Sequence, residues 1–270
     1  MSIKTWLDDA SHQLSQIDIP SARLDAELLL AASLYKSREY LLAHSEQTLS
    51  NAELTQVNKW LQRRLDREPI AYILGHKEFY GRDFMVSPNV LIPRPESETI
   101  IEILKGLQPE TIIDIGTGSG CLAISAKLEI TDSKVISTDI SEDALQIARQ
   151  NASSLNAEIT FAISDLLSGV KKIKSDKPIA LVANLPYVDK SWNVSPETTF
   201  EPSMALFADD DGLKMIKKLI LQAAKKLRPN DNLLLEADTR QHQAITKYAK
   251  KHGFKLEKID GFIALYTLAE

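Results

Sequence analysis

The chain has 270 residues, of which 44% are hydrophobic and 26% charged, enough to bury the core of one large domain or two modest ones. No apolar run approaches the roughly 18 residues of a membrane span, and the opening stretch MSIKTWLDDASHQ lacks the apolar core of a signal peptide. We therefore expect a soluble, cytoplasmic protein. The single cysteine, Cys121, excludes an internal disulfide, and the five histidines lack metal-ligand spacing, so no metal site is expected.

The net charge of −5 is spread evenly along the chain. Residues 1–86 carry 10 basic and 12 acidic side chains, which leaves 22 basic and 25 acidic side chains for the remainder. Neither part has the basic excess of a domain that binds nucleic acid through its phosphates, so direct nucleic-acid binding is not expected. The one basic cluster is interpreted as a solvated loop and consists of Lys171, Lys172, Lys174 and Lys177.

Residues 1–68 have the pattern of a small helical domain. Apolar residues recur at spacings of three and four, which predicts three amphipathic helices over residues 6–14, 22–35 and 50–65. Ser50 with Glu53 fits a capping box at the start of the third helix. The next stretch, PIAYILGHKEFYGRDFMV, is rich in β-branched and aromatic residues around two glycines, and it predicts a β-hairpin linker over residues 69–90.

The second domain is predicted over residues 91–270. From about Pro109 onward it alternates short apolar strands with helical stretches, which is typical of an α/β domain with a mostly parallel sheet. The last two strands are separated only by a turn, so one of them is expected to run antiparallel. The seven predicted strands cover residues 111–115, 134–140, 159–164, 179–184, 232–237, 254–260 and 262–268.

A glycine-rich turn, DIGTGSG, follows the first of these strands, and Asp139 ends the second. Glycines let the backbone approach a ligand closely, and an acidic residue about 20 positions later can bind ribose hydroxyls, so the two features indicate a nucleoside-containing ligand. The dinucleotide pattern would need glycine at position 121, where Cys121 stands. The spacing of Gly116, Gly118 and Gly120 instead resembles that of class I methyltransferases, which bind S-adenosylmethionine.

Each of these residues also has a structural alternative, because glycines often serve only as turn residues and Asp139 can cap the helix that follows it. The combination favours a ligand site. Asp165 ends the third strand and Asn184 the fourth, and packing alone does not require polar residues at the same edge of a sheet.

The stretch NLPY, which closes the fourth strand, offers a way to hold a methyl acceptor. An NH2 group has two donors, which the Asn184 side-chain oxygen and the Leu185 carbonyl can accept. This draws electron density onto the nitrogen and fixes its direction of attack. Pro186 would keep the turn rigid, and Tyr187 would stack on the planar acceptor. No strong base is needed, because the proton can leave after the methyl group has arrived.

NLPY resembles the Asn-Pro-Pro-Tyr or Asp-Pro-Pro-Tyr signature of amino-methyltransferases, and the whole chain resembles the release-factor glutamine methyltransferases, also called the PrmC/HemK family. The similar blocks are PIAYILGHKEFYGRDFMV, VLIPRPESE, IIDIGTGSGCLAI, STDISEDAL, LVANLPYV, FEPSMAL and LLLEADTRQ. The resemblance implies a Rossmann-like class I methyltransferase domain over residues 91–270. It also implies methyl transfer from S-adenosylmethionine to the glutamine side-chain nitrogen (N5) in the Gly-Gly-Gln motif of class 1 peptide-chain release factors, which modulates translation termination.

The resemblance assigns residues as well. Asp139 would bind the cofactor's ribose, Asp165 with Leu166 its adenine, and the N-terminal helices would help to dock the release factor. The implied cofactor-binding residues are Asp114, Gly116, Thr117, Gly118, Ser119, Gly120, Asp139, Asp165, Leu166 and Asn184. The implied catalytic and substrate-binding residues are Asn184, Leu185, Pro186 and Tyr187.

Several positions depart from the family pattern, among them Ser97 and Leu185. Ser97 stands where threonine is usual, and Leu185 replaces the usual first proline, as in dimethyladenosine rRNA methyltransferases. The alternative function is therefore an adenine-N6 methyltransferase acting on rRNA or DNA, against which stand the acidic balance and the long region before the glycine loop. A binding protein without catalysis is disfavoured, because both the glycine loop and NLPY look intact.

Overall fold

The computed structural model describes residues 1–170, 175 and 177–270, so Lys171, Lys172 and Lys174 of the basic cluster lie outside the described residues. The chain divides into two compact units: Met1–Gly75 with Ser195–Phe200, and His76–Val194 with Glu201–Glu270. This division differs from the predicted one, because the hairpin belongs to the second unit and residues 195–200 belong to the first. None of the helices in the described part of the chain has both the length and the apolar character needed to cross a membrane.

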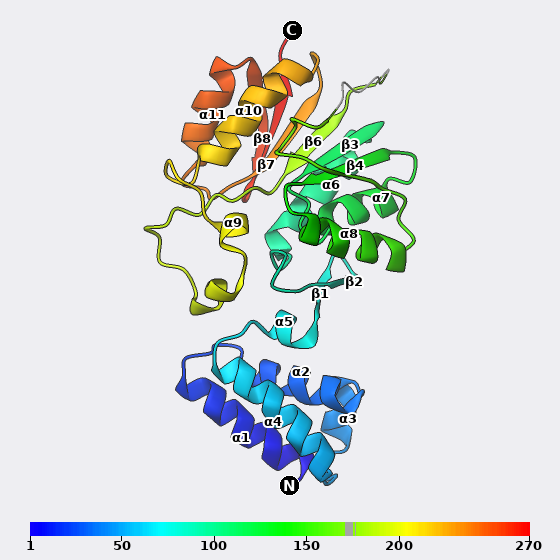
Figure 1. Cartoon of the computed structure of the whole chain (residues 1–270), viewed down its shortest axis with the longest axis vertical. Helices are drawn as coiled ribbons and strands as arrows, with labels where there is room; N and C mark the ends of the chain where they lie inside the picture. Colours follow the sequence, from blue (N-terminus) through cyan, green and yellow to red (C-terminus); the bar gives the residue numbers. More distant parts are fainter. Residues whose placement is uncertain (171–174, 176) are drawn as a thin grey trace. The chain divides into compact units, whose positions relative to one another are not determined.

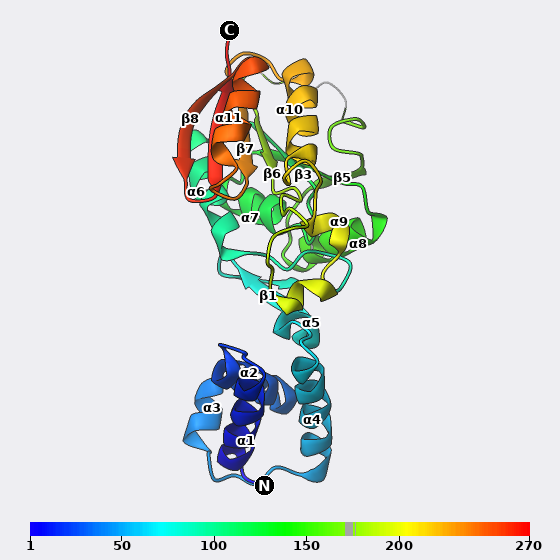
Figure 2. The same ribbon diagram turned by 90° about the vertical axis from the view of Figure 1, so that its left-hand side faces the viewer.

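The first unit is helical (Figures 1 and 2). Its elements are α1 (Ile3–Gln16), α2 (Ala22–Leu34), α3 (Arg38–Ala43), α4 (Asn51–Leu65), α5 (Ile70–Leu74) and the 3₁₀ helix η2 (Pro196–Phe200). The three predicted helices are confirmed as α1, α2 and α4. The capping box is also confirmed, because the Ser50 N–H donates to Glu53 Oε2 at 2.7 Å and the Glu53 N–H donates to Ser50 Oγ at 3.3 Å. The apolar faces of these helices form a core that includes Trp6, Leu14, Leu29, Leu30 and Val57.

Residues 70–74 form the helix α5, so the prediction that the hairpin begins at residue 69 is wrong. Pro69 at the N-cap fixes φ at −56°, and Gly75 ends the helix in the left-handed conformation with φ +82°. Tyr72 and Ile73 are buried, and their packing overrides the strand preference of aromatic and β-branched residues.

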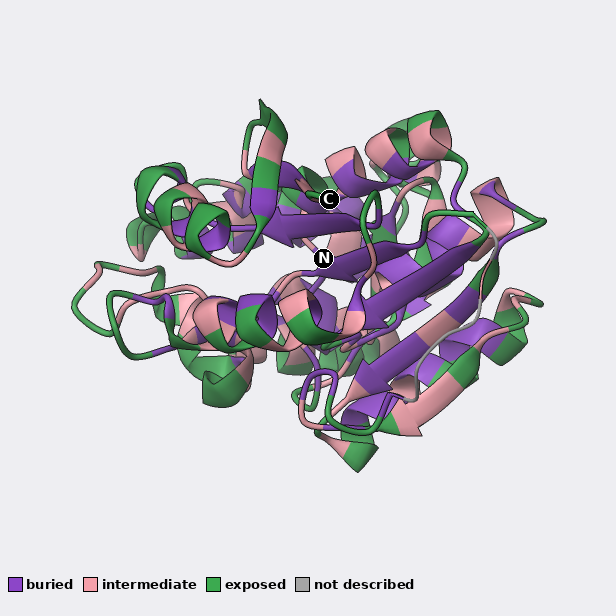
Figure 3. Cartoon of the chain, turned by 90° about the horizontal axis from the view of Figure 1, so that it is seen from above, coloured by how far each residue is buried: buried purple, intermediate pink, exposed green. Residues whose placement is uncertain are grey.

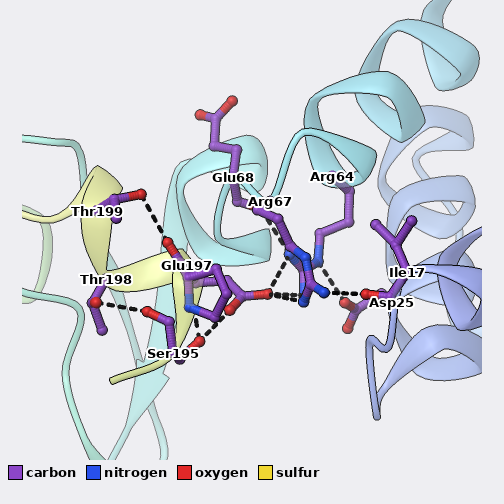
Figure 4. Close-up of polar contacts among 10 residues, drawn as sticks. Ile17, Asp25, Arg64, Arg67, Glu68, Ser195, Glu197, Thr198 and Thr199 are labelled. Carbon is purple, nitrogen blue, oxygen red and sulfur yellow. Dashed lines mark hydrogen bonds and ion pairs between the residues drawn. The ribbon is translucent and has the colours of Figure 1, made fainter. Parts of the chain in front are cut away.

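A partly buried ionic cluster holds residues 195–200 within the first unit (Figure 4). The Arg64 side chain is 6% exposed; its Nε donates to Asp25 Oδ2 at 2.7 Å and its Nη1 to Glu197 Oε1 at 3.1 Å. Arg67 Nη1 donates to the same Glu197 oxygen at 3.2 Å. Burial raises the pKa of the Glu197 carboxyl, but hydrogen bonds from a nearby serine, a backbone N–H and both arginines outweigh burial and bring that pKa to about 2. The carboxylate therefore stays ionised and paired at neutral pH.

The second unit contains a hairpin and a seven-stranded sheet with helices on both faces (Figure 1). The sheet order is β5-β4-β3-β6-β7-β9-β8, in which β9 alone runs opposite to the other six strands, as predicted for one of the last two strands. The elements are β1 (His76–Phe79), β2 (Arg82–Met85), η1 (Pro95–Ser97), α6 (Glu98–Leu107), β3 (Thr111–Ile115), α7 (Cys121–Glu129), β4 (Lys134–Asp139), α8 (Glu142–Ser154), β5 (Thr160–Ile163), β6 (Ala180–Ala183), α9 (Ser203–Leu206), α10 (Lys214–Lys226), β7 (Asn232–Glu236), α11 (His242–Lys251), β8 (Phe254–Asp260) and β9 (Ile263–Leu268).

Each face of this sheet has its own apolar core. Leu181 and Ala183 of β6 pack with side chains of α10 and α11, whereas Ala180 and Val182 point to the opposite face and pack with α6 and α7. The central strands are consequently buried along their length (Figure 3). Strands fixed on both faces give a rigid support to the loops that follow their carboxyl ends.

Candidate active site

Four neighbouring parallel strands deliver predicted site residues to one edge of the sheet. Ile115, at the end of β3, pairs with Thr138 on β4 and with Ala183 on β6, so the carboxyl ends of these strands lie at one level. The chain adds β4 and β5 on one side of β3 and then β6 and β7 on the other, which makes β3 a topological switch point. A cavity of about 400 Å³ lies at this edge and is lined by the loops that follow β3, β4, β5 and β6.

The glycine loop folds back onto the end of β4. The N–H groups of Gly116 and Thr117 both donate to the Thr138 carbonyl, at 2.8 and 3.0 Å. The Gly118 N–H donates to Asp139 Oδ2 at 2.9 Å. Gly116 and Gly118 have φ of +73° and +54°, which glycine adopts without strain. The loop and the Asp139 carboxylate are thus fixed relative to each other.

Asp139 presents a fixed carboxylate to the cavity. Its Oδ2 accepts from Gly118, and its Oδ1 accepts from the Ser141 N–H at 2.9 Å. A carboxylate is an acceptor only and has lone pairs left for two hydroxyl donors. The next side chain, Ile140, lines the same cavity and is 53% exposed, so an apolar surface lies beside the carboxylate.

Asp165 and Leu166 line the cavity after β5. The Asp165 carboxylate pairs with Lys218 Nζ at 2.5 Å. Leu166 is buried with φ +53°, and its carbonyl accepts from Ser164 Oγ at 2.8 Å, which holds the turn in this conformation.

Two of the ten predicted cofactor residues, Asp114 and Gly120, do not line the cavity. Asp114 is 1% exposed and lies under the glycine loop, where its Oδ2 accepts from Thr117 Oγ1 at 2.6 Å. Burial raises the pKa of Asp114 to about 6, although the Thr117 hydrogen bond opposes it. Gly120 begins α7 at φ +83°, where a Cβ would lie 3.0 Å from Ile124 Cδ1. Both residues therefore shape the loop from behind.

Asn184, Leu185 and Pro186 line the cavity next to the glycine loop. The Leu185 side chain is 4% exposed and lies against that loop, because a Cβ on Gly116 would be 3.1 Å from Leu185 Cδ2. A leucine at this position thus fills an apolar gap, and its backbone carbonyl is independent of the side chain.

Tyr187 does not line the cavity, so the structure gives no support to the predicted stacking on the acceptor. Its hydroxyl donates to Glu236 Oε1 at 3.3 Å, and burial, with Glu236 nearby, raises the pKa of this hydroxyl. The Tyr187 carbonyl accepts from Gln241 Nε2 at 2.8 Å. Gly212 packs so closely on this carbonyl that a Cβ there would collide with its oxygen. Both ends of the residue are therefore anchored.

Sequence reasoning missed a buried hydrogen-bond chain behind Asn184. Asn184 Nδ2 donates to Ser97 Oγ at 3.1 Å, and Ser97 Oγ donates to Glu236 Oε2 at 2.6 Å. Ser97 is 2% exposed and Glu236 1%. Burial raises the pKa of Glu236 to about 7, although the hydrogen bonds from Ser97 and Tyr187 oppose it. Glu236 lies at the end of an apolar strand just as Asn184 does, which is a usable sequence signal. Ser97 is marked in the sequence only as a departure from the threonine that is usual in the family.

A second buried carboxylate joins the LIPRPE and EPSMAL blocks. Glu201 is 6% exposed; it accepts from the Ile92 N–H at 3.1 Å and from the Arg94 guanidinium. Arg94 is thereby committed to an internal ion pair at the cavity wall.

Comparisons with known proteins agree with this geometry. Residues 5–75 match the family model described as "PrmC N-terminal domain", and residues 95–198 match "Methyltransferase small domain". A release factor glutamine methyltransferase of Koribacter versatilis is 42% identical over 245 residues, which cover 87% of this chain and 86% of that protein. A methyltransferase structure from Pyrococcus furiosus has a TM-score of 0.55 at 20% identity, covering 79% of this chain and 100% of that chain, and shares the Rossmann-like fold.

A longer relative also matches. A bifunctional methyltransferase of Rickettsia bellii is 34% identical over 294 residues, which cover 96% of this chain but 52% of that protein. The chain therefore spans about half the length of the Rickettsia bellii relative and most of the length of the Koribacter versatilis one.

Proposed function

This chain belongs to the release factor glutamine methyltransferase family, and we propose from this that it methylates a glutamine side chain. The methyl donor is S-adenosylmethionine, and the acceptor is the amide nitrogen (N5) of the glutamine in the Gly-Gly-Gln motif of class 1 peptide-chain release factors. The observation that carries the proposal is that Asn184 and Leu185 line one cavity beside the glycine loop. The Asn184 side-chain oxygen and the Leu185 carbonyl are the proposed acceptors.

The lining of the cavity fits S-adenosylmethionine. Asp139, held by two backbone N–H groups, suits the hydroxyl donors of a ribose. Asp165 and Leu166 offer a carboxylate and an apolar side chain to the adenine, and the first turn of α7 offers the positive end of a helix to a carboxylate. When bound, the cofactor would supply a methyl group activated by a sulfonium, and breaking the bond between sulfur and methyl would leave S-adenosylhomocysteine as the product.

Asn184 and Leu185 orient the nitrogen that receives the methyl group. Because Asn184 Nδ2 donates to Ser97, the Oδ1 atom on the other arm of the amide is the group that accepts from the substrate. The Leu185 carbonyl is the second acceptor for the two N–H donors of the glutamine amide. Fixing both donors aims the nitrogen and stabilises the positive charge that develops on it. A strong base is not required, because the proton leaves after the methyl group has arrived.

The helical first unit is proposed to dock the release factor, and the cytoplasm is the proposed site of action. An adenine NH2 group would present the same two donors, which is the basis of the alternative function. The even charge balance and the named relatives support glutamine over adenine.

Incubation of the full chain with methyl-labelled S-adenosylmethionine and either a class 1 release factor or rRNA tests the proposal. We expect label in the release factor only, and none in a release factor whose Gly-Gly-Gln glutamine is replaced by alanine. Label in rRNA with none in the release factor would overturn the assignment.

A further inference from the structure

We infer that Ser97 and Glu236 are positioning residues that hold the Asn184 side chain with its oxygen toward the acceptor. They lie on separate elements, Ser97 at the end of η1 and Glu236 at the end of β7, and the function proposed above gives neither of them a contact with the cofactor or the substrate. The inference rests on that proposed function, because it concerns how the acceptor amide is held.

An asparagine amide needs such a device because its two ends have nearly the same shape. Rotation by half a turn exchanges Oδ1 with Nδ2. In the exchanged orientation Asn184 would present N–H donors to the N–H donors of the substrate amide. Two donors cannot form a hydrogen bond, so the substrate amide would lose one of the two hydrogen bonds that hold it.

The hydrogen-bond chain has a direction that selects one orientation. An ionised carboxylate can only accept hydrogen bonds, so the Ser97 hydroxyl donates its one hydrogen bond to Glu236, at 2.6 Å. The serine oxygen can then only accept from its other neighbour. That neighbour must present a donor, which is Asn184 Nδ2 at 3.1 Å. The Glu236 carboxylate at one end of the hydrogen-bond chain thus sets the orientation of the Asn184 amide at the other end.

Burial makes this selection effective, since Ser97 and Glu236 are 2% and 1% exposed and water does not compete for their lone pairs. The second Glu236 oxygen accepts from the Tyr187 hydroxyl at 3.3 Å. One carboxylate therefore holds both the first and the last residue of NLPY, Asn184 and Tyr187.

Once protonated, the Glu236 carboxyl could donate a hydrogen bond to Ser97 Oγ instead of accepting one. The Ser97 hydroxyl could then donate to Asn184 Oδ1. Burial raises the pKa of Glu236 to about 7, so we expect an acidic limb in the rate near neutral pH. The titratable groups around this carboxyl are Tyr187, Glu96 in η1 and Cys121 in α7, and Arg94 acts on Tyr187.

The test measures kcat, KM, cofactor affinity and the pH profile of four variants of the full chain. Ser97→Ala is expected to lower kcat on the order of 10²-fold, the cost of a misplaced reacting group, with cofactor affinity unchanged. Ser97→Thr keeps the hydroxyl and is expected to recover most of the turnover. Glu236→Gln is expected to lower kcat and to remove the acidic limb, because nothing at that position titrates.

Ser125→Ala is the matched control. Ser125 lies in α7 with 0% exposure, and its hydroxyl has no hydrogen-bond partner among the described residues, so its loss should leave turnover at the wild-type level. The inference is overturned by a Ser97→Ala variant that turns over like Ser125→Ala, or by a Glu236→Gln variant that keeps the acidic limb. A wild-type chain that transfers no methyl group to glutamine would instead refute the proposed function.

Discussion

Replacing Gly212 by alanine tests whether the NLPY loop depends on a close backbone approach. Gly212 has φ +79°, and a Cβ there would collide with the Tyr187 carbonyl oxygen and lie 2.7 Å from its carbonyl carbon and 2.5 Å from Gln241 Nε2. The Tyr187 carbonyl oxygen and carbon belong to the backbone, and Gln241 Nε2 already donates to that carbonyl. No rotamer change relieves the contact, so the loop itself must move.

Two costs add in this variant. Alanine at positive φ costs about 1–2 kcal/mol, and overpacking costs roughly 1–3 kcal/mol, so the free energy of unfolding should fall by about 2–5 kcal/mol. Tyr187 lies three residues after Asn184. A displacement of about 1 Å that reaches Asn184 should therefore lower kcat on the order of 10²-fold.

Gly261→Ala separates the two costs. Gly261 has φ +58° in the turn between β8 and β9, and a Cβ there would meet no atom within 4 Å. This variant should lose only about 1–2 kcal/mol in urea unfolding and keep the wild-type kcat. If Gly212→Ala matches Gly261→Ala in both stability and turnover, the close approach does not position the loop.

Three further variants test other parts of the structure. Asn184→Ala should lower kcat by roughly 10²- to 10³-fold, the cost of one stabilising hydrogen bond in a pre-organised site, while calorimetry shows retained cofactor binding; near-normal turnover would contradict its role. Arg64→Ala leaves the buried Asp25 carboxylate without its partner and should cost about 3–5 kcal/mol in urea unfolding, whereas no measurable loss would contradict a buried pair. Burial raises the pKa of Asp114 from 3.8 to about 6, so the folded state holds this proton more tightly and stability falls as pH rises from about 4 to 6. Asp114→Asn should lack that fall of about 3 kcal/mol, at about 1.4 kcal/mol per pKa unit; parallel stability curves for the variant and the wild type would refute the shift.

The residues that reach the cavity from strand ends were predictable, because local sequence determines where an apolar strand stops. Asp139, Asp165 and Asn184 each lie at or just after the end of such a strand, and parallel pairing brings these strand ends to one edge. Glu236 obeys the same rule at the end of β7 and could have been found by it. Ser97 could not, because it precedes its partner Asn184 by 87 residues and lies in a short 3₁₀ helix.

Long-range packing explains the other differences between prediction and structure. The helix α5 contains residue types that favour strands, and the burial of its side chains stabilises the helical conformation instead. Residues 195–200 join the helical unit because Glu197 pairs with Arg64, 133 positions away. Asp114 and Gly120 belong to the predicted cofactor loop, yet the Asp114 side chain is buried and a Cβ on Gly120 would point into the interior. The spacing of residues in the sequence does not reveal these directions.

Tandem mass spectrometry of a class 1 release factor after incubation with the chain and S-adenosylmethionine identifies the methyl acceptor directly. We predict one added methyl group on the side-chain nitrogen of the Gly-Gly-Gln glutamine with the wild-type chain, and a large reduction with Asn184→Ala. An unmodified glutamine, with the methyl group on another residue or on adenine of added rRNA, would contradict the proposed role of Asn184 and Leu185 as the clamp for a glutamine amide.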